Sequence, residues 1–171
     1  MTAPGSCATV FTVYGIPVDV RPLTAGDRDR LADAFGRMSE RSRRDRFLGA
    51  KPRLSPAELT YLTDVDHRRH EALAAIDPDD DRIVGVARYA VEPAEPGTAD
   101  IALFVVDAWQ RQGIATMLGE RIVQRAGENG IARLRATTFA DNRAARAVLR
   151  RLGFVAVGIG AGVVELERRR G

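Results

Sequence analysis

The fold is decided by the stretch Phe104-Val105-Val106-Asp107-Ala108-Trp109-Gln110-Arg111-Gln112-Gly113-Ile114-Ala115-Thr116-Met117-Leu118, which predicts a strand, a tight glycine turn and a helix in direct succession. A helix that begins directly after a strand leaves several backbone N–H groups unpaired at the positive end of its dipole. Gly113 lets the backbone approach a bulky group closely, and Arg111 adds positive charge beside it. The stretch therefore predicts a site for a phosphate or pyrophosphate.

The glycine spacing does not fit either of the two common phosphate-binding loops. No Lys-Ser or Lys-Thr pair follows Gly113 as in a P-loop, and the three-glycine dinucleotide fingerprint is missing. For so short a motif, an ordinary tight turn between a strand and a helix is an equally good interpretation. The rest of the chain has to decide between the two.

The length of 171 residues fits one domain, and a domain of this size buries roughly 70% of the surface that its unfolded chain exposes. Hydrophobic residues at 45% and charged residues at 29% are typical of a soluble globular protein, so disorder over most of the chain is excluded. Residues 1–8 are small and polar, and we expect a disordered N-terminus there. Residues 9–171 are expected to form a single domain.

The charge and the cysteine count narrow the class of protein further. The net charge is only +3, and the arginines are spread along the chain rather than clustered, so we expect no nucleic-acid partner. Cys7 is the single cysteine, which excludes an internal disulfide and leaves too few thiols for a structural zinc site, so no metal is expected. No apolar run reaches the ~18 residues of a membrane span, and a signal peptide is not apparent. We expect a cytoplasmic protein with no membrane partner.

The order of the expected elements predicts an α+β fold, in which one mixed α/β sheet carries helices on both faces. Hairpins and single strands alternate with helical segments, and each helix has an identifiable start or stop signal. The expected strands span residues 9–13, 18–21, 71–77, 82–91, 98–106, 134–139, 154–157 and 163–166. Helices are expected after Thr24, between 39 and 48 as part of a helical pair with the segment from Ser55, after Gly113, and after Asp141 or Asn142.

The opening motif resembles the acetyl-CoA loop of the GNAT acyltransferase superfamily, Gln/Arg-x-x-Gly-x-Gly/Ala, through Gln110, Gly113 and Ala115. The segment from Asn142 to Phe154 is similar to the GNAT segment in which Asn-x-x-Ala begins a helix that ends in Gly-Phe. Both motifs stand in the order that the family requires. The resemblance implies a GNAT-like central sheet, mixed but mostly antiparallel, of about seven strands flanked by about four helices.

A finer match lies upstream of both motifs. It resembles the acetyltransferase domain of bacterial protein-lysine acetyltransferases and consists of Arg21-Pro22-Leu23, Met38-Ser39, Arg46-Phe47, Leu62-Thr63-Asp64-Val65-Asp66 and His70. Some of those relatives carry a cyclic-nucleotide domain, and we expect none in this chain. The match favours a protein lysine as the acceptor.

The resemblance also implies where acetyl-CoA, the expected co-substrate, binds. The backbone N–H groups of Val105 and Val106 would receive the acetyl and pantetheine groups, and Asn142 would complete the pantetheine contacts. The pyrophosphate would be held by the loop residues Gln110, Arg111, Gln112, Gly113, Ile114 and Ala115.

The related lysine acetyltransferases use a glutamate on the central strand as the general base, and Asp100 stands at that position in this sequence. A partly buried carboxylate there suits a general base, whereas an aspartate at a strand end paired with an arginine is the alternative interpretation. Many family members place a tyrosine as the thiolate's acid where this chain has Leu149. His67 and His70 are weak candidates for that acid.

We therefore expect an acetyl-CoA-dependent N-acetyltransferase that acts on a primary amine, possibly a protein lysine, by direct attack on the thioester. A small-molecule amine acetyltransferase is one alternative, and a non-catalytic acyl-CoA-binding regulatory module is another. The expected partners are acetyl-CoA and the amine acceptor, and the expected oligomeric state is a monomer or a homodimer.

Overall fold

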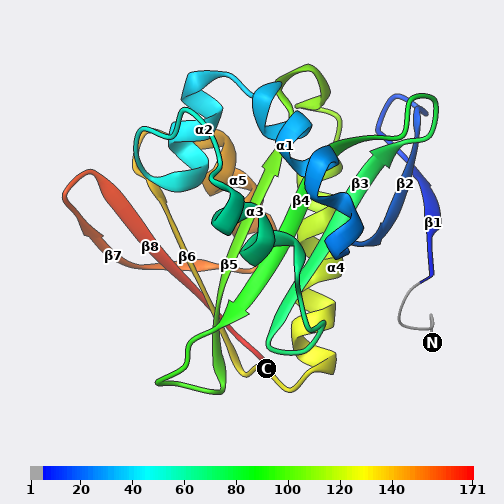
Figure 1. Cartoon of the computed structure of the whole chain (residues 1–171). Helices are drawn as coiled ribbons and strands as arrows, with labels where there is room; N and C mark the ends of the chain where they lie inside the picture. Colours follow the sequence, from blue (N-terminus) through cyan, green and yellow to red (C-terminus); the bar gives the residue numbers. More distant parts are fainter. Residues whose placement is uncertain (1–5) are drawn as a thin grey trace.

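The computed structural model describes residues 6–171, which form one eight-stranded sheet in the order β1-β2-β3-β4-β5-β6-β8-β7 (Figure 1). The strands are β1 Ala8–Phe11, β2 Pro17–Pro22, β3 His70–Asp77, β4 Arg82–Val91, β5 Thr98–Val105, β6 Arg133–Phe139, β7 Val155–Gly160 and β8 Val163–Arg169. The helices are α1 Arg28–Gly36, α2 Glu40–Phe47, α3 Pro56–Thr63, α4 Ile114–Glu128 and α5 Arg143–Arg151, with 3-10 turns η1 Ala25–Asp27 and η2 Asp107–Trp109.

The sheet is mixed but mostly antiparallel, as the sequence predicts, because β5 and β6 are its one parallel pair among the described residues. The eight strands correspond to the eight strand segments expected from the sequence, with β1 paired with β2 at the edge of the sheet, and the family resemblance implied about seven. The five α-helices likewise correspond to the five helical segments expected from the sequence, and the resemblance implied about four. Leu48 ends α2 in the left-handed conformation, and Ser55 caps α3, so the helical pair follows α1 as two further, separate helices.

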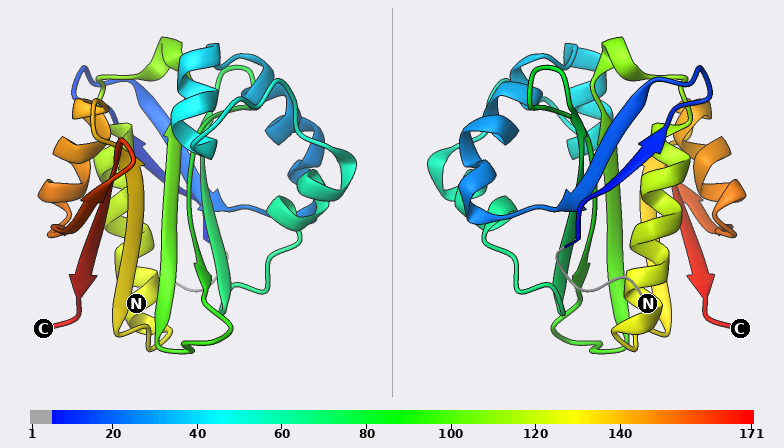
Figure 2. Two further views of the ribbon diagram at one scale, coloured as in Figure 1. Left: turned by 90° about the vertical axis from the view of Figure 1, so that its left-hand side faces the viewer. Right: turned by 90° about the vertical axis from the view of Figure 1, so that its right-hand side faces the viewer.

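Helices cover both faces of the sheet (Figure 2). The long helix α4 lies on one face together with α5, and α1, α2 and α3 lie on the other. Two buried hydrophobic clusters correspond to the two faces: one contains Leu118 and Ile122 of α4, and the other contains Leu31 of α1 and Leu62 of α3.

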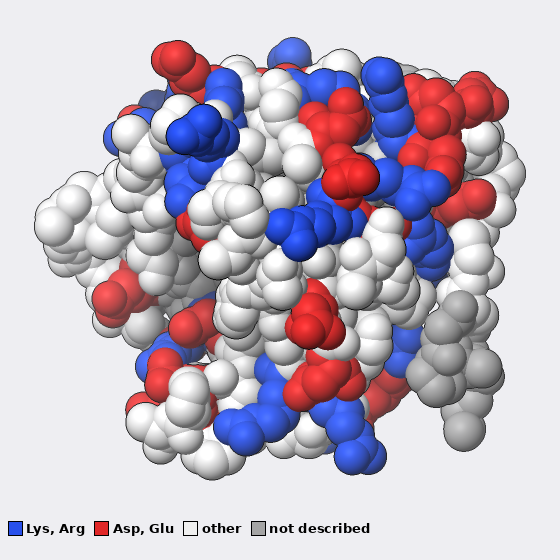
Figure 3. Space-filling model, in the orientation of Figure 1, with Lys and Arg blue, Asp and Glu red and all other residues white. Residues whose placement is uncertain are grey.

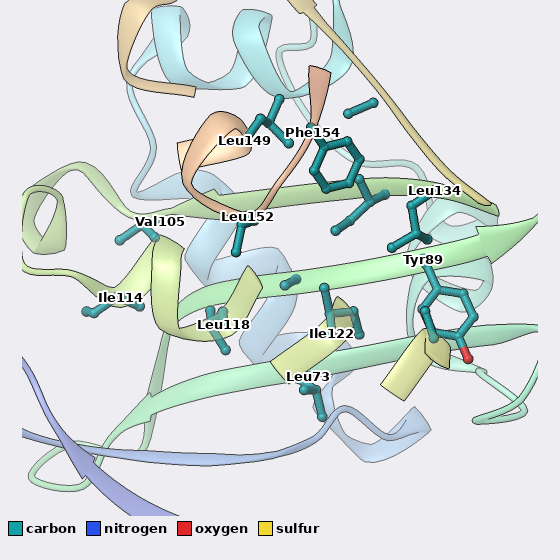
Figure 4. Close-up of a cluster of buried hydrophobic side chains, with 14 of the residues drawn as sticks. Leu73, Tyr89, Val105, Ile114, Leu118, Ile122, Leu134, Leu149, Leu152 and Phe154 are labelled. Carbon is teal, nitrogen blue, oxygen red and sulfur yellow. The ribbon is translucent and has the colours of Figure 1, made fainter. Parts of the chain in front are cut away.

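The face of α4 that packs on the sheet is the one that the sequence predicts. Ile114, Leu118, Ile122 and Ala126 recur at four-residue spacing, and all four are buried. Figure 4 shows three of these side chains reaching from α4 into the cluster between the helix and the strands. This packing fixes the start of α4 relative to β5, and so holds the strand, glycine turn and helix of residues 104–118 in place.

The sheet divides between β5 and β6. The two strands pair only over Thr98–Asp100 and Arg133–Arg135, and in Figure 1 they run close together at the bottom and separate towards the top. Because the outer edge of β5 has no strand partner after Asp100, backbone N–H and C=O groups along it are available to a ligand. The candidate site lies where the two strands separate.

At the N-terminal end, the expected disordered segment 1–8 falls mostly on residues 1–5, which lie outside the described residues. Ala8 differs from the expectation, because it is the first residue of β1. The predicted hairpin with β2 is confirmed by the register of Ala8 opposite Val20. Across the described part of the chain, no helix is both long and apolar enough to span a bilayer.

Candidate active site

A cavity of about 860 Å³ lies where β5 and β6 separate. Its walls come from the separated halves of both strands, from the first turns of α4 and α5, and from α2. A volume of this size is in the range of cavities that hold cofactors and drug-sized ligands. Its position between two diverging strands means that backbone groups as well as side chains line it.

The start of α4 supplies backbone N–H donors at one end of the cavity, which we call the α4 end. Gly113 is the N-cap of this 15-residue helix and has φ of +83°, in the left-handed region where a side chain is strained. Met117 makes the first bond of the helix, from its N–H to the Gly113 carbonyl O at 3.0 Å. The N–H groups of Ile114, Ala115 and Thr116 therefore have no intrahelical acceptor, and all three residues line the cavity.

The loop before α4 is held by its own side chains. Gln110 lines the cavity, and its Nε2 donates to the Val105 carbonyl O at 3.0 Å, which ties the loop back to β5. Arg111 lines the cavity in the left-handed conformation, with φ of +60°. Gln112 does not line the cavity, and its carbonyl O accepts a bond from Val13 N–H at 3.0 Å. Gln112 therefore positions the loop, and Arg111 provides the charge.

The two valines of the motif differ. Val105 is buried and lines the cavity at the end of β5. Val106 is buried outside the lining, and its N–H donates to the Val84 carbonyl O at 2.8 Å. The expectation that Val106 offers a free donor is therefore not met in this structure, because β4 already uses that group.

Asn142 caps α5 on the β6 side of the cavity. Its Oδ1 accepts a bond from Ala145 N–H at 3.1 Å, which confirms it as the N-cap that the sequence predicts. Because the oxygen is committed to the cap, the side-chain NH₂ is the part of Asn142 that remains for a ligand. Asn142 lines the cavity opposite the start of α4.

Helix α2 lines another side of the cavity, which we call the α2 end, and Gln110 Nε2 donates to its Ser42 Oγ at 3.3 Å. A carboxylate attaches α2 to the loop after β5. Asp107 accepts bonds from Ser39 N–H at 2.9 Å, Ser39 Oγ at 2.8 Å and Ser42 Oγ at 3.0 Å. Partial burial acts to raise the pKa of Asp107, but these hydrogen bonds outweigh burial and hold the pKa below its usual range. Sequence reasoning did not find these contacts, because Ser42 and Ser39 stand 65 and 68 residues before Asp107 in the sequence.

Leu149, which stands where many family members have a tyrosine, lines the cavity. Leu149 is buried there, so an acid at this position would face the ligand. The hydroxyl groups that line the cavity instead belong to Ser39, Ser42, Thr116, Thr137 and Thr138. Leu149 itself offers no proton.

Asp100 lies at the apex, where the pairing of β5 with β6 ends. Its side chain is 61% exposed, and Arg135 Nε donates to its carboxylate at 3.1 Å. The partial burial that the sequence suggested is therefore wrong, because the position next to the separation is open to solvent. The next residue, Ile101, lines the cavity, whereas Asp100 does not.

The two histidines lie outside the cavity lining. His70 Nε2 is 3.1 Å from Arg88 Nη1, so it accepts a bond from a permanent donor. Burial, with the charge of Arg88 second, lowers the pKa of His70 to about 4. His70 is therefore neutral at pH 7. His67 Nδ1 contacts the buried Glu71 carboxylate at 2.7 Å.

Exposed arginines give the cavity rim a positive charge. Arg41, Arg111 and Arg143 all line the cavity and are exposed, each on a different element. On the face drawn in Figure 3, basic and acidic side chains are interspersed rather than gathered into one patch. Asp45, Asp107 and Asp141 also line the cavity, so its positive charge is local to the individual arginines, each of which can meet an anionic group of a ligand.

Comparison with known proteins adds independent information. The model of the Acetyltransferase (GNAT) family matches residues 37–154, which include both ends of the cavity. "Acetyltransferase PA5475" of Pseudomonas aeruginosa is 34% identical over 143 residues, which cover 82% of this chain and 76% of that protein. The match is long enough to include the whole sheet from β3 to β6.

Two further relatives carry the name Pat. "Acetyltransferase Pat" of Mycolicibacterium smegmatis is 29% identical over 148 residues, which cover 86% of this chain but only 44% of that protein. The crystal structure of the GNAT domain of S. lividans PAT superposes with a TM-score of 0.89 at 29% identity and covers 96% of this chain and 97% of that domain. The likeness to the mycobacterial protein thus extends over less than half of its length.

Proposed function

The chain belongs to the GNAT acetyltransferase family, and from that premise we propose that it transfers the acetyl group of acetyl-CoA to a primary amine by direct attack on the thioester. Members of this family use acetyl-CoA. The observation that carries the proposal is the cavity between β5 and β6, which the first turn of α4 faces with N–H groups that have no intrahelical acceptor.

We assign the residues of the α4 end to the CoA moiety. The N–H groups that follow Gly113 would hold the pyrophosphate, with Arg111 adding charge, and Gln110 keeps the loop in place through Val105. The free edge of β5 at Val105 and the Asn142 amide would receive the pantetheine. A side chain at Gly113 would be strained at φ of +83°, and its Cβ would meet Val13 Cγ1 at 3.0 Å, so it would displace the loop that this arrangement needs.

Acetyl-CoA, when bound, supplies an acetyl thioester that a neutral amine can attack. The chain then has to hold both reactants in line, remove a proton from the amine and stabilise charge on the thioester oxygen. Backbone N–H groups on the free edge of β5 would serve the oxygen. Holding the reactants in the cavity supplies much of the rate, because a bimolecular step becomes effectively unimolecular.

We propose Asp100 as the group that receives the proton of the amine, through a water molecule. It stands at the apex of the separated strands, on the face that carries α1, α2 and α3. Its carboxylate accepts a bond from Arg135 Nε at 3.1 Å, and 61% of its side chain is exposed, so a water molecule can reach it. The alternative is a purely structural ion pair with Arg135, which predicts an unchanged kcat when Asp100 is replaced by Asn.

The direct test is an assay of CoA thiol release from acetyl-CoA with a panel of primary amines. Transfer predicts release that depends on the amine and rises above hydrolysis. A regulatory module that only binds acyl-CoA predicts calorimetric binding with no release for any amine, and Leu149 in place of the tyrosine is the observation that favours this second candidate. Absence of both binding and release would reject both functions.

For the acceptor we propose a protein lysine, because two of the relatives are named Pat and the upstream residues match such enzymes. A small-molecule amine is the alternative. Quantitative acetyl-lysine proteomics with and without the protein separates them. New acetyl-lysine sites in its presence support the proposal, and an unchanged acetylome redirects the search to small amines.

A further inference from the structure

Two arginines at the α2 end of the cavity have no carboxylate partner. Arg46 of α2 lines the cavity, and Arg88 of β4 is buried behind it, with 6% of its surface exposed. Within residues 6–171, neither guanidinium lies within ion-pair distance of an Asp or Glu. A buried charge without a partner is costly, so Arg88 needs an explanation, and the half-buried Arg46 adds a second positive charge at the cavity.

The contacts of Arg88 satisfy only part of its hydrogen-bonding capacity. Its Nη1 donates to the Leu62 carbonyl O and to His70 Nε2, both at 3.1 Å. Both acceptors are neutral groups. A guanidinium carries five N–H donors, so several remain.

The carboxylates of Asp45, Asp66 and Asp100 are bound to other groups. Asp45 pairs with Arg41 and Arg44, at 3.9 and 3.4 Å. Asp66 accepts three backbone N–H bonds, from residues 68, 69 and 70. Asp100 pairs with Arg135. Neither Arg46 nor Arg88 thus has a carboxylate partner among the described residues, and Arg46 lies over the ring of Phe47, 4.8 Å from its centroid.

Both arginines remain cations at neutral pH. Burial lowers the pKa of Arg46 to about 10. Burial, with the charge of Arg46 second, lowers the pKa of Arg88 to about 9. The cross-strand partner of Arg88, Ala102, lines the same cavity as Arg46, so the two guanidinium groups belong to one region of the site.

The pair is not placed to bind the phosphates of CoA. Neighbouring residues of β4 alternate between the two faces, and Val86 packs in the cluster beneath α1 and α3 whereas Ala87 and Tyr89 pack in the cluster beneath α4. Arg88 therefore lies on the face opposite α4. Its cross-strand partner Ala102 is three residues before Val105, about 10 Å along the strand from the α4 end.

We propose that Arg46 and Arg88 form a carboxylate-binding subsite for the acceptor, so that the amine that is acetylated belongs to a molecule with a carboxylate near it. Ala102 lines the cavity directly in front of Arg88, so the subsite adjoins the cavity rather than a separate surface. Asp100 is on the same face of β5, two residues from Ala102. This inference rests on the proposed acetyl transfer and specifies its acceptor.

The subsite also suits the reaction. Two positive charges near an ammonium group favour its neutral form, which is the form that attacks the thioester. They would repel a purely cationic acceptor, so a carboxylate on the acceptor is what makes binding favourable. The carboxylate can come from a free amino acid or from an acidic residue next to a lysine.

The test compares matched acceptors by their kcat/KM with acetyl-CoA. One pair is a free amino acid and its carboxamide, and the other is a lysine peptide with Glu beside the lysine and the same peptide with Gln there. For at least one pair, we expect the acid to exceed the neutral compound about tenfold or more, as charge-assisted hydrogen bonds predict. The pair that shows the preference identifies the source of the carboxylate.

Variants assign the preference to the two arginines. Arg46→Gln and Arg88→Gln should each reduce the ratio of acid to neutral compound to near one, mainly through the KM of the acid. Arg44→Gln is the matched control, because Arg44 is an exposed residue of the same helix that lies over Phe139 and does not line the cavity. Arg46 is only half-buried, so its variant remains informative if Arg88→Gln does not fold.

Three outcomes would overturn the proposal: no preference in the wild type, an equal loss in Arg44→Gln, or a preference for succinyl-CoA over acetyl-CoA that the two arginines control. The last would assign the subsite to the acyl donor. Calorimetry of the same acceptor pairs without acetyl-CoA keeps the two proposals separate. If no amine is acetylated but the acid still binds about tenfold more tightly than its neutral partner, the proposed function fails and the subsite stands.

Discussion

The two ends of the cavity are built from different parts of the chain. At the α4 end, the groups that face the ligand are mostly backbone N–H groups, positioned by the direct connection of β5 to α4. At the α2 end they are side chains, such as Arg46 and Ser42, held by contacts between elements that are far apart in sequence. Under the proposed function, recognition of the shared co-substrate would depend on backbone geometry, whereas the choice of acceptor would depend on individual side chains.

This difference has a direct consequence for mutagenesis. Substitutions at the α2 end and at the apex should change catalysis or the KM of the amine and leave the affinity for acetyl-CoA almost unchanged. Substitutions that disturb the backbone at the α4 end should do the opposite. Each experiment below can sharpen or break that separation.

The largest effect is expected at the apex. Asp100→Asn keeps the size of the side chain but removes the proposed base, so kcat should fall about 10²-fold with the KM for acetyl-CoA within about twofold. Steady-state kinetics with saturating amine measure both values. Asp100→Glu restores the residue of the lysine acetyltransferases and should keep or raise kcat.

Arg135→Gln is the control for the structural alternative, because it breaks the same ion pair and keeps the carboxylate. If Asp100 is only a partner of Arg135, both Asp100→Asn and Arg135→Gln will leave kcat unchanged at saturating amine. Normal turnover by the asparagine variant would thus remove Asp100 from the chemistry.

A smaller effect is expected from the attachment of α2. Asp107→Asn weakens its hydrogen bonds to Ser39 and Ser42, so α2 is held less firmly and the KM of the amine should rise about tenfold. Glu40→Gln, a change of the same charge at an exposed position of α2, should leave the KM unchanged. An equal rise in both variants would show that net charge, rather than the attachment, is responsible.

The same carboxylate predicts a pH dependence of stability. Because the pKa of Asp107 is lowered in the folded state, its contribution is complete above its unfolded value of about 3.9 and is lost as the pH falls through the lower folded value. The difference in melting temperature between wild type and Asp107→Asn should therefore be constant from pH 5 to 7 and shrink below pH 4. A difference that grows on acidification would contradict this account.

The smallest effect is expected at Leu149. Leu149→Tyr restores the hydroxyl that many family members have, and the side chain already faces the cavity. A thiolate is a weak base and can leave without an acid, so we expect kcat to rise only about threefold. Leu149→Phe supplies the ring without the hydroxyl, and an equal rise in kcat for both variants would show that the acid is not the reason.

Sequence reasoning was most successful where structure is local. The strand, the turn at Gly113, the helix face of α4 and the Asn142 cap depend on neighbouring residues, and their spacing and start signals were sufficient to predict them. The α+β sheet followed from the order of the elements. The eight strand segments read from the sequence all formed strands, including the edge pair of β1 and β2, and the about seven strands implied by the family resemblance are close to that number.

The α2 end could not be predicted, since its groups come together only after folding. Nothing near Asp107 in sequence identifies Ser39 as its partner, and nothing near Arg88 indicates that it is buried without a carboxylate. The exposure of Asp100 was mispredicted for the same reason: the separation of β5 from β6, a property of the sheet, opens that position to solvent.

The most direct test of the central claim is the affinity for acetyl-CoA, measured by calorimetry on Gly113→Val and Gly130→Val. Both glycines lie at ends of α4 in the left-handed conformation, with φ of +83° and +78°, so both variants carry a backbone strain of about 1–2 kcal/mol, and at Gly113 the added Cβ also meets Val13 Cγ1 at 3.0 Å and displaces the loop. Only Gly113 lines the cavity. We predict that Gly113→Val weakens acetyl-CoA binding at least about tenfold and that Gly130→Val binds as the wild type does. Equal affinities of the two folded variants would contradict the assignment of the α4 end to the CoA moiety.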